Sequence, residues 1–215
     1  MKRAFFYKDE KSDKFWAIHA EGEAFAVHYG KTGTAGKFDI KEFGDADECA
    51  KAAEKLIRSK QAKGYKEAPD FDFSAQIYID TDEIGPHRLS SHPRFAAHFT
   101  DDFYYDCGDE EAPFGSDEGS DTLNLLEEYI RKNRNGDIVY FPQRVMEKDW
   151  GMEYIPPDFF DEAGIKAEIA KPDDAIPRSQ LLTINDQVII ATALGQIKIM
   201  GEVSQRLKVH AQNAL

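Results

Sequence analysis

The chain has 215 residues and a mass of 24.4 kDa, and its 41% apolar and 31% charged residues exclude the disordered, collagen-like and membrane-spanning classes. The longest apolar stretch, residues 188–194, is too short to cross a bilayer. The charged start MKRAFFYKDEKSDK leaves no room for a secretory signal, so we expect a cytoplasmic protein without a membrane partner. Cys49 and Cys107 form no CxxC pair, which indicates reduced thiols and argues against a structural zinc site.

Charge is distributed unevenly along the chain. Residues 1–69 hold 14 Lys or Arg and 12 Asp or Glu, a net charge of +2, whereas residues 70–215 hold 13 and 28, a net charge of −15. The change near KEAPDFDFS, at 66–74, predicts two domains, residues 1–69 and 70–215. The net charge of the whole chain, −13, opposes attraction to a phosphate backbone.

The first domain begins with short segments that are rich in aromatic and β-branched residues and are separated by turn residues. These segments are RAFFY at 3–7, KFWAIHA at 14–20, EAFAVHYG at 23–30 and GKFDIKEF at 36–43. Alternation is clear in the last of them, where Phe38 and Ile40 face one way and Asp39 and Lys41 face the other. The pattern predicts a small antiparallel β-meander.

A helix is expected to follow the meander and to cover one of its faces. Asp45 stands where an N-cap belongs, and Glu48 completes the spacing of a capping box. The residues that recur at helical spacing, and so form the buried face, are Cys49, Ala53, Leu56 and Ile57. Gly64 is suited to end the helix, which completes an α+β domain of four strands and one helix.

The segment HYGKTGTAGKFDIKEF, residues 28–43, contains GKT, the centre of a phosphate-binding loop. A Walker loop needs a glycine where this chain has Phe25, and a helix directly after GKT, where this chain has a strand. The spacing of Gly30, Gly33 and Gly36 does not match G-x-G-x-x-G either. We interpret the three glycines as positive-φ turn positions of a hairpin.

The ordered set YGKTGTAG, Phe43, the alanine-rich ECAKAAEKLIRSK and the KGY that ends at Tyr65 resembles the WGR domain. The resemblance covers residues 1 to about 69 and implies a sheet-plus-helix unit, with a Trp-Gly-Arg triplet on one strand. In the WGR domains of DNA-dependent ADP-ribosyltransferases this surface meets a DNA end. The Trp stacks there near the terminal sugar, and basic side chains hold phosphates.

Carried over to this chain, the triplet becomes Tyr29, Gly30 and Lys31, and the resemblance implies a nucleic-acid contact that Lys37 and Lys41 extend. Tyr29 keeps an aromatic face for stacking. Lys31 keeps the positive charge but loses the bidentate fork of arginine. Two alternatives stay open from the residues alone. Tyr29 could fill one face of the sheet, and Lys31 could be a solvated charge in the hairpin.

The second domain is expected to be an acidic mixed α/β domain that is largely helical. Residues 74–85 and 137–141 predict strands, and residues 92–99 predict a short helix that opens near a proline. Towards the end of the chain, apolar residues at helical spacing predict a helix over 185–199, and Ser204 is suited to cap a final helix.

Another helix, of about 15 residues, is expected near the middle of the chain, with Asp117 or Ser120 as its cap. Its buried face is predicted to consist of Leu123, Leu126 and Ile130. Glu127 and Arg131 have the spacing of an exposed ion pair one turn apart.

Residues 101–121 carry nine acids and no base, together with aromatic residues that a purely solvating tail lacks, so we expect an ordered loop. The acids that could meet a basic protein partner or a cation are Asp106, Asp109, Glu110, Asp117 and Asp121. EF-hand spacing is absent, and a zinc site of His92, His98 and Cys107 is a weaker alternative, so no metal is assigned. APFGSDEGSDTL resembles a segment of a YfeS- and MolR-like group of uncharacterised bacterial proteins that also carry a WGR domain.

No nucleophile elbow, His-Glu-x-x-His or Cys-His arrangement occurs in the sequence, so we expect a non-enzymatic binding module without a cofactor. The leading hypothesis is a regulator that contacts a DNA end or strand through the WGR-like surface. Its acidic domain would cover Lys31, Lys37 and Lys41 until a partner arrives. The alternative is a protein-interaction or regulatory adaptor, and a hydrolase that uses the carboxylates of the acidic loop is a third hypothesis.

Overall fold

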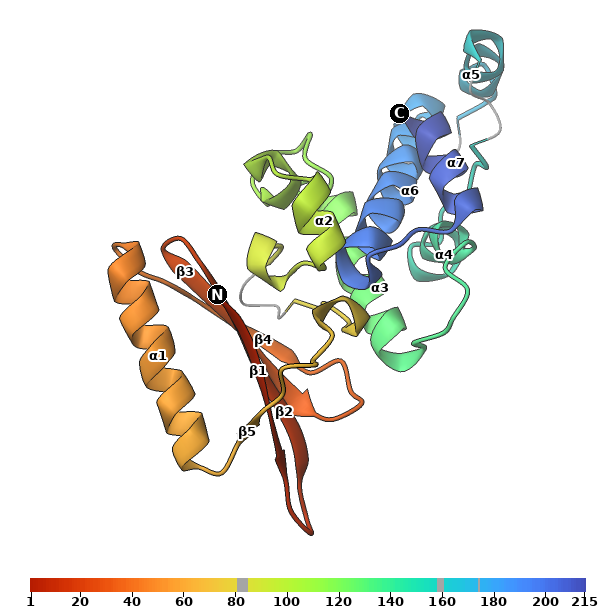
Figure 1. The fold of residues 1–215 in the computed structure, drawn as a ribbon. Coiled ribbons are helices and arrows are strands. Elements are labelled where there is room, and N and C mark those ends of the chain that lie inside the picture. The colour runs from red at the N-terminus through yellow and green to blue at the C-terminus, as the bar shows by residue number, and fades with distance from the viewer. Residues whose placement is uncertain (81–84, 158–160, 174) are drawn as a thin grey trace. The chain divides into compact units, whose positions relative to one another are not determined.

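The computed structural model describes residues 1–80, 85–157, 161–173 and 175–215 (Figure 1). By its internal contacts the chain divides into two units, Met1–Ala97 and His98–Leu215. The domain boundary expected after residue 69 stays a prediction, since the contacts of the first unit extend beyond it. Among the described residues, no helix combines the length and the apolar character needed to cross a membrane.

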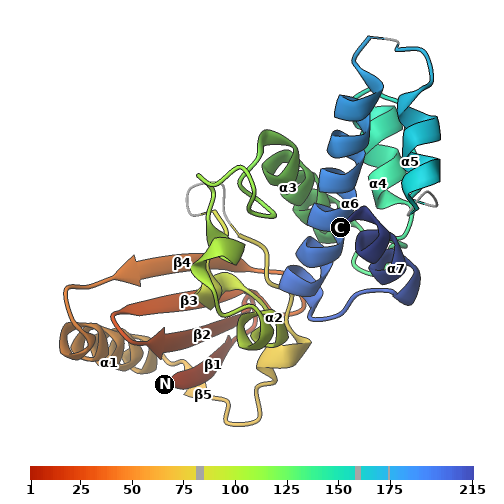
Figure 2. The ribbon, with the colours of Figure 1, turned by 90° about the horizontal axis from the view of Figure 1, so that it is seen from above.

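The first unit is built on an antiparallel sheet with the strand order β4-β3-β2-β1-β5 (Figure 2). Its strands are β1 (Lys2–Lys8), β2 (Asp13–Glu21), β3 (Ala24–Lys31), β4 (Lys37–Glu42) and β5 (Lys66–Glu67). The meander predicted from the sequence is therefore confirmed. The fifth strand was not expected, because its two residues have no pattern of their own and are held by pairing with Phe5 and Phe6 of β1.

Helix α1 (Ala46–Ala62) packs against one face of the sheet (Figure 1). The predicted cap is confirmed, because the Asp45 side chain accepts a hydrogen bond of 2.8 Å from the backbone N–H of Glu48. Cys49, Ala53 and Ile57 are buried, whereas Leu56 is 36% exposed. Leu56 was placed on the wrong face, since the four-residue spacing from Cys49 leads to Ile57 and leaves Leu56 on the flank of the helix.

Residues 71–80 and 85–98 include the segments that cover the opposite face of the same sheet (Figure 2). They form three short helical elements, η1 (Phe73–Ala75), η2 (Arg88–Ser90) and α2 (Pro93–His98). The helix predicted at 92–99 is confirmed. The strand predicted at 74–85 is wrong over its described part, residues 74–80, because residues 77–80 are all buried in irregular backbone instead of alternating between two faces. Gly85 is not in a strand either, and residues 81–84 lie outside the described residues.

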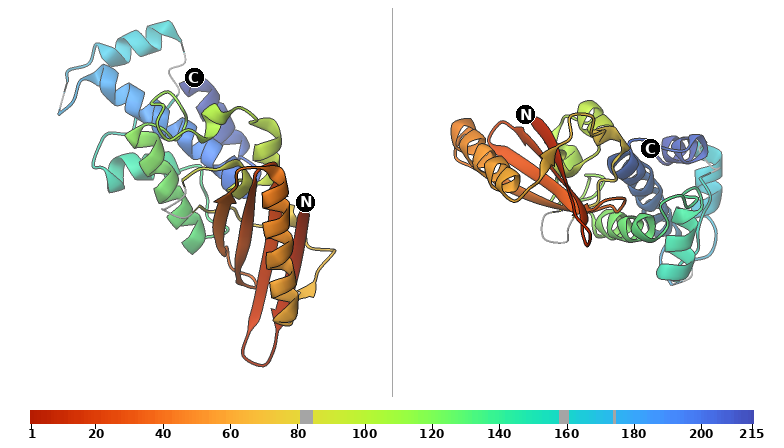
Figure 3. Two further views of the ribbon diagram at one scale, coloured as in Figure 1. Left: turned by 90° about the vertical axis from the view of Figure 1, so that its left-hand side faces the viewer. Right: turned by 60° about the horizontal axis from the view of Figure 1, so that its bottom comes forward.

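The second unit is largely helical, as expected. Its elements are η3 (Asp102–Tyr105), α3 (Asp117–Lys132), α4 (Phe141–Arg144), the π-helical η4 (Val145–Asp149), α5 (Glu162–Ile169), α6 (Arg178–Met200) and α7 (Gln205–Ala214). Helices α3 and α6 lie side by side (Figure 3). Gly195 permits this close approach, because a Cβ atom there would lie 2.9 Å from Leu126. The helix predicted at 185–199 is confirmed within α6, and the predicted cap of the final helix, Ser204, accepts a hydrogen bond from Leu207.

In the second unit the structure corrects the predicted cap of α3 and the predicted strand at 137–141, and it confirms the predicted buried face of α3. The cap of α3 is Ser116, whose hydroxyl accepts a 3.0 Å hydrogen bond from Gly119, and neither Asp117 nor Ser120. The strand predicted at 137–141 is absent, because Asp137 turns the chain by accepting a hydrogen bond from Val139 and Phe141 then begins α4. The buried face of Leu123, Leu126 and Ile130 is confirmed.

Glu127, which was predicted to lie on the outside of α3, is buried instead. Its carboxylate lies 3.5 Å from the ammonium of Lys198, a fully buried residue of α6. A charge from the neighbouring helix thus draws Glu127 inward, and no pattern within α3 reveals that partner.

Candidate nucleic-acid interface

The three residues of the predicted triplet, Tyr29, Gly30 and Lys31, end strand β3. In the sheet register Tyr29 lies between Trp16 of β2 and Lys37 of β4, so these three side chains share the face that α1 covers. Tyr29 is 37% exposed, because α1 packs over Trp16 and leaves the ring beside it only partly covered. The alternative that Tyr29 is a buried core residue is therefore wrong.

A groove of about 670 Å³ runs between α1 and this face of the sheet, and we call it the Tyr29 groove. Its main lining side chains are Trp16, Tyr29, Lys41, Lys55, Leu56 and Lys60. The groove combines an aromatic floor with lysines from two elements, β4 and α1. Asp39 is the acid within the lining, and it occupies the position between Lys37 and Lys41 on β4.

Lysine side chains of the groove lie against aromatic rings. The ammonium of Lys60 lies 5.3 Å from the ring centre of Trp16 and 5.2 Å from that of Tyr65. Lys41 lies 5.2 Å from the ring centre of Phe43. Burial, together with the neighbouring charges of Lys63 and Lys14, lowers the pKa of Lys60. A cation that is partly desolvated and repelled by other cations gains from the arrival of an anion.

At the hairpin end of the same face, Lys31 lies directly opposite Lys14 of β2. Like charges in directly opposed positions destabilise a sheet, so this pair lowers the stability of the isolated fold while raising the local positive potential. Asp13 offsets part of that charge, although its carboxylate also accepts a hydrogen bond from Thr32 and lies 3.0 Å from Lys8.

The glycines of the opening segment have two different roles. Gly33 and Gly36 have φ of +83° and +70°, as the turn interpretation predicted. Gly30 lies in β3 without a positive φ, so that interpretation is wrong for this residue. A Cβ atom at Gly30 would lie 2.8 Å from the Cα atom of Gly36 and 3.3 Å from the ring of Phe15. Gly30 is needed because the hairpin folds back over it.

The sequence predicted part of the groove and missed the rest. Tyr29, Lys37 and Lys41 do share one face, as their strand positions suggested. Sequence reasoning missed Trp16, Lys14, Lys55 and Lys60, which come from β2 and α1. Pairing the predicted strands in register could have identified Trp16 beside Tyr29. The two lysines of α1 depend on where the helix lies across the sheet.

The acids predicted as a second site are all exposed in the second unit. Asp106 accepts a 2.7 Å hydrogen bond from the backbone of Gly108, and Asp109 accepts one of 3.0 Å from that of Glu111. These two carboxylates therefore stabilise turns. Glu110 directly follows Asp109 along the chain and is exposed.

Asp117 and Asp121 lie on the first turns of α3 and line a shallow groove of about 310 Å³ with Trp150 and Met152. Within the described ranges, no group of three or more His, Cys, Asp or Glu side chains is placed to hold a metal ion. The acidic loop is thus ordered, as predicted, and the contacts of Asp106 and Asp109 are structural.

Comparison with known proteins identifies the family. The family model of the WGR domain matches residues 1–72. Over 215 residues the chain is 48% identical to the uncharacterised protein YfeS of Escherichia coli strain K12, across 100% of this chain and 86% of that protein. The chain belongs to the YfeS family of WGR-domain proteins.

Two further matches cover less of the chain. The protein YehF of Escherichia coli strain K12 is 49% identical over 65 residues, which are 30% of this chain and 24% of YehF. The chain also matches a crystal structure of a protein from Bacteroides fragilis. The match covers 65% of this chain and 45% of the Bacteroides chain, with 25% sequence identity and a TM-score of 0.32. The match to the WGR model confirms the fold that the sequence resemblance implied for residues 1 to about 69.

Proposed function

We propose that this chain is a non-enzymatic regulator that acts in the cytoplasm and contacts nucleic acid through the Tyr29 groove. The observation that supports this most strongly is the exposed ring of Tyr29 between lysines of the sheet and of α1. Single strands and duplex ends bind to surfaces that offer an aromatic face for a base or sugar and cations for the backbone. WGR domains are linked to nucleic-acid binding, which agrees with this chemistry.

Each part of the groove then has a role. Tyr29 stacks on a terminal base or sugar, while Lys31 and Lys37 hold phosphates at the hairpin end of the sheet. Lys41 and Lys60 neutralise the phosphates that follow along the groove. Lysines that contact phosphates act as point charges and carry no sequence information, so the groove is expected to recognise an end or a strand with little sequence preference.

The experiment is a fluorescence-anisotropy titration of a blunt, 5′-phosphorylated DNA duplex with the full chain at low and moderate salt. We expect binding that weakens steeply with salt, because phosphate contacts release counterions. Lys41→Glu should weaken binding and lower the slope of log K against log salt by about 1. The matched control is Lys66→Glu, an exposed lysine of β5 at the other edge of the sheet, which should change affinity much less.

We further propose that the acidic second region restrains this binding. Residues 70–215 carry a net charge of −15, against +2 for residues 1–69. Replacing Asp109, Asp117 and Asp121 together by Asn in the full chain should therefore raise affinity at low salt, with a smaller gain at moderate salt. An affinity that stays unchanged at both salt concentrations would show that the acidic loop does not restrain the groove.

A protein partner is a second candidate for the same groove. The exposed side of Leu56 adds an apolar wall beside Tyr29, which a peptide side chain could contact as well as a base. Salt separates the two candidates, since a peptide held by apolar contact loses little affinity between low and moderate salt. Absence of duplex binding even at low salt would contradict the nucleic-acid proposal and favour this second one.

A further inference from the structure

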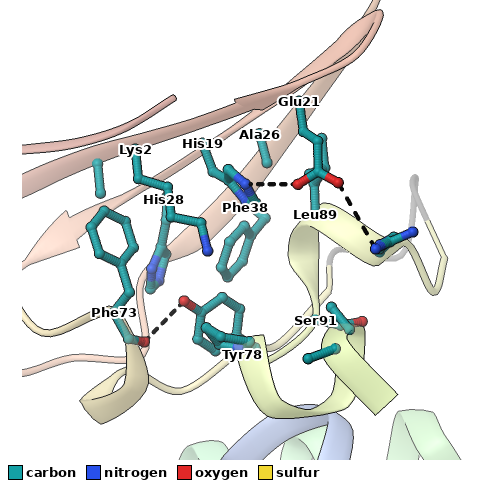
Figure 4. Close-up of a pocket in the computed structure, with 15 residues that line it drawn as sticks. Lys2, His19, Glu21, Ala26, His28, Phe38, Phe73, Tyr78, Leu89 and Ser91 are labelled. Carbon is teal, nitrogen blue, oxygen red and sulfur yellow. Dashed lines mark hydrogen bonds and ion pairs between the residues drawn. The ribbon is translucent and has the colours of Figure 1, made fainter. Parts of the chain in front are cut away.

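A second cavity lies on the other face of the sheet, between the strands and residues 73–97, and we call it the Tyr78 pocket (Figure 4). Its volume is about 190 Å³. All of its lining residues belong to the first unit. It goes beyond the proposed function, because Tyr29 and the lysines of the groove point to the opposite face of the strands.

The floor of the Tyr78 pocket is apolar, and its side chains are buried except that of Phe73, which is half-buried. Its main side chains are Ala17, Ala26, Phe38, Phe73, Tyr78 and Leu89. His28 stacks on Phe38 with ring centres 4.1 Å apart, and Phe38 stacks on Tyr78 at 5.3 Å. The hydroxyl of Tyr78 donates a hydrogen bond of 3.0 Å to the backbone carbonyl of Phe73, which holds both rings at the pocket wall.

The mouth of the pocket carries charged side chains. Lys2 lies opposite His19 in the register of β1 and β2, and Figure 4 shows Lys2 pointing from the sheet toward the covering segment. Glu21 lies 3.2 Å from the imidazole of His19 and 3.9 Å from the guanidinium of Arg88. Burial and the nearby charge of Lys2 lower the pKa of His19 to about 4, so this ring is neutral at pH 7.

The charges at the mouth therefore leave an excess of one positive charge, from Lys2 and Arg88 against Glu21. The ammonium of Lys2 lies 5.9 Å from the ring centre of Phe73, and no acid among the described residues lies within ion-pair distance of it. The guanidinium of Arg88 has five donors, and its contact to Glu21 at 3.9 Å is long for a hydrogen bond. Each of the two cations thus keeps donors for a small anion at the mouth of the pocket.

We propose that the Tyr78 pocket binds a small aromatic monocarboxylate, with its ring on the apolar floor and its carboxylate at the cationic mouth that Lys2 and Arg88 line. An engineered cavity of about 150 Å³ holds benzene, so about 190 Å³ accommodates one ring with a carboxylate. A doubly charged phosphate ester would place excess negative charge beside Glu21. The rings of Phe73 and Tyr78 favour an aromatic over an aliphatic ligand of the same size.

The test is a titration of the full-length protein with benzoate, followed by ¹H–¹⁵N NMR. We expect saturable shifts of backbone signals around the pocket, at Ala26, Leu89 and Ser91, without comparable shifts at Tyr29. Acetate, cyclohexanecarboxylate, benzylamine and inorganic phosphate are the comparison ligands, and each should bind at least about fivefold more weakly than benzoate. Equal or tighter binding of any of them, or no binding of benzoate, would overturn the assignment.

Variants test separately how the mouth and the interior of the pocket contribute to benzoate binding. Lys2→Gln and Arg88→Gln change exposed side chains, and each should weaken benzoate binding by about tenfold. Ala96→Phe, on the half-buried side of α2, should fill the cavity and abolish binding while the remaining NMR signals keep their positions. Unchanged benzoate affinity in any of these variants would contradict the proposal.

Two control variants connect this test to the groove. Lys66→Gln removes an exposed lysine of β5 and should leave benzoate affinity unchanged. Lys41→Glu, the variant designed to weaken duplex binding, should leave it unchanged too, because Lys41 lines the groove on the other face. Failure of the groove proposal and failure of the pocket proposal are therefore distinguishable. Loss of benzoate binding in Lys41→Glu would contradict a separate site.

Discussion

His28 and Tyr29 are neighbours in β3, yet they belong to two different surfaces. The ring of His28 is 6% exposed and is enclosed by Phe15, Phe38 and Tyr78. Tyr29, on the face of α1, is 37% exposed. One face of the sheet thus encloses its aromatic side chains, while the other leaves one of them beside lysines.

The difference arises from what covers each face. A straight helix covers only a strip of a twisted sheet, so β3 and the edge strand β4 extend beyond α1 and border a groove. On the other face the covering residues 71–80 and 85–97 are largely irregular, and they pack rings against rings. On this sheet the regular covering element leaves an open groove, and the irregular one encloses a pocket. The predictions below test this contrast, beginning with the largest expected effect.

Gly36→Ala should cause the largest loss of stability, because it disturbs the packing on the enclosed face of the sheet. Gly36 has φ of +70°, and a Cβ atom there would lie 2.7 Å from the ring of Phe15 and 2.8 Å from Nε2 of His28. We expect the free energy of unfolding to fall by about 3 kcal/mol. Urea unfolding monitored by tryptophan fluorescence measures this, in a Trp150→Phe background so that Trp16 reports on the first unit alone.

The matched control for this prediction is Gly33→Ala in the same hairpin. Gly33 also has a positive φ, of +83°, but a Cβ atom there would meet no atom within 4 Å. Gly33→Ala should lower the free energy of unfolding by only about 1 kcal/mol, because only the backbone conformation is strained. Equal losses in the two variants would show that the packing of the hairpin on Phe15 and His28 adds nothing.

The pH dependence of stability should report the burial of His28. Burial lowers its pKa from 6.5 to about 4. Below pH 6.5 the unfolded chain binds a proton that the folded chain does not accept until about pH 4, so stability is lost as the pH falls through this window. The wild type should lose about 2 kcal/mol more than His28→Gln between pH 7 and pH 4.5.

The measurement is the free energy of unfolding of both proteins at each pH. Carboxylates titrate in both proteins, so their contribution cancels in the difference. His19 is present in both proteins, so its contribution to the pH dependence of stability also cancels in the difference. A wild type and a variant that lose equal stability would contradict the enclosure of His28.

Tyr29→Ala should change the open face of the sheet and leave the enclosed face unchanged. We expect affinity for the DNA duplex to fall about tenfold, which corresponds to ~1.4 kcal/mol, because one stacking surface is lost. Tyr29→Phe should keep most of the affinity, since stacking needs only the ring. The NMR spectrum of residues around the Tyr78 pocket should stay unchanged in both variants. Weaker binding in Tyr29→Phe by the same factor would assign the role to the hydroxyl instead of the ring.

Asp45→Ala should have the smallest effect, on the helix that borders the groove. The Asp45 side chain caps α1 through the backbone N–H of Glu48, and its loss should lower the free energy of unfolding by about 1 kcal/mol. Asp45→Asn retains a capping oxygen and should preserve nearly all of the stability. Urea unfolding of the three proteins in the Trp150→Phe background measures this. A full loss in Asp45→Asn would contradict a capping role.

Local patterns in the sequence predicted the elements whose signals are short in range. The four strands of the meander, the Asp45 cap, the short helix at Pro93 and the helix capped by Ser204 each depend on residues within a few positions of one another. The cap of α3 was predicted at Asp117 or Ser120 instead of Ser116, because all three are suitable capping types and sequence alone does not rank them.

The sequence by itself determined the meander, the helix that follows it and the WGR resemblance, because alternation, capping and glycine spacing are properties of neighbouring residues. The family resemblance also grouped Tyr29, Lys37 and Lys41 in one contact surface. Only the tertiary structure decided that Tyr29 is exposed, that Lys60 joins it, and that residues 71–97 enclose a pocket on the other face. The physical reason is that a period of two separates the faces of a strand, whereas the exposure of each face depends on segments that pack there from elsewhere in the chain.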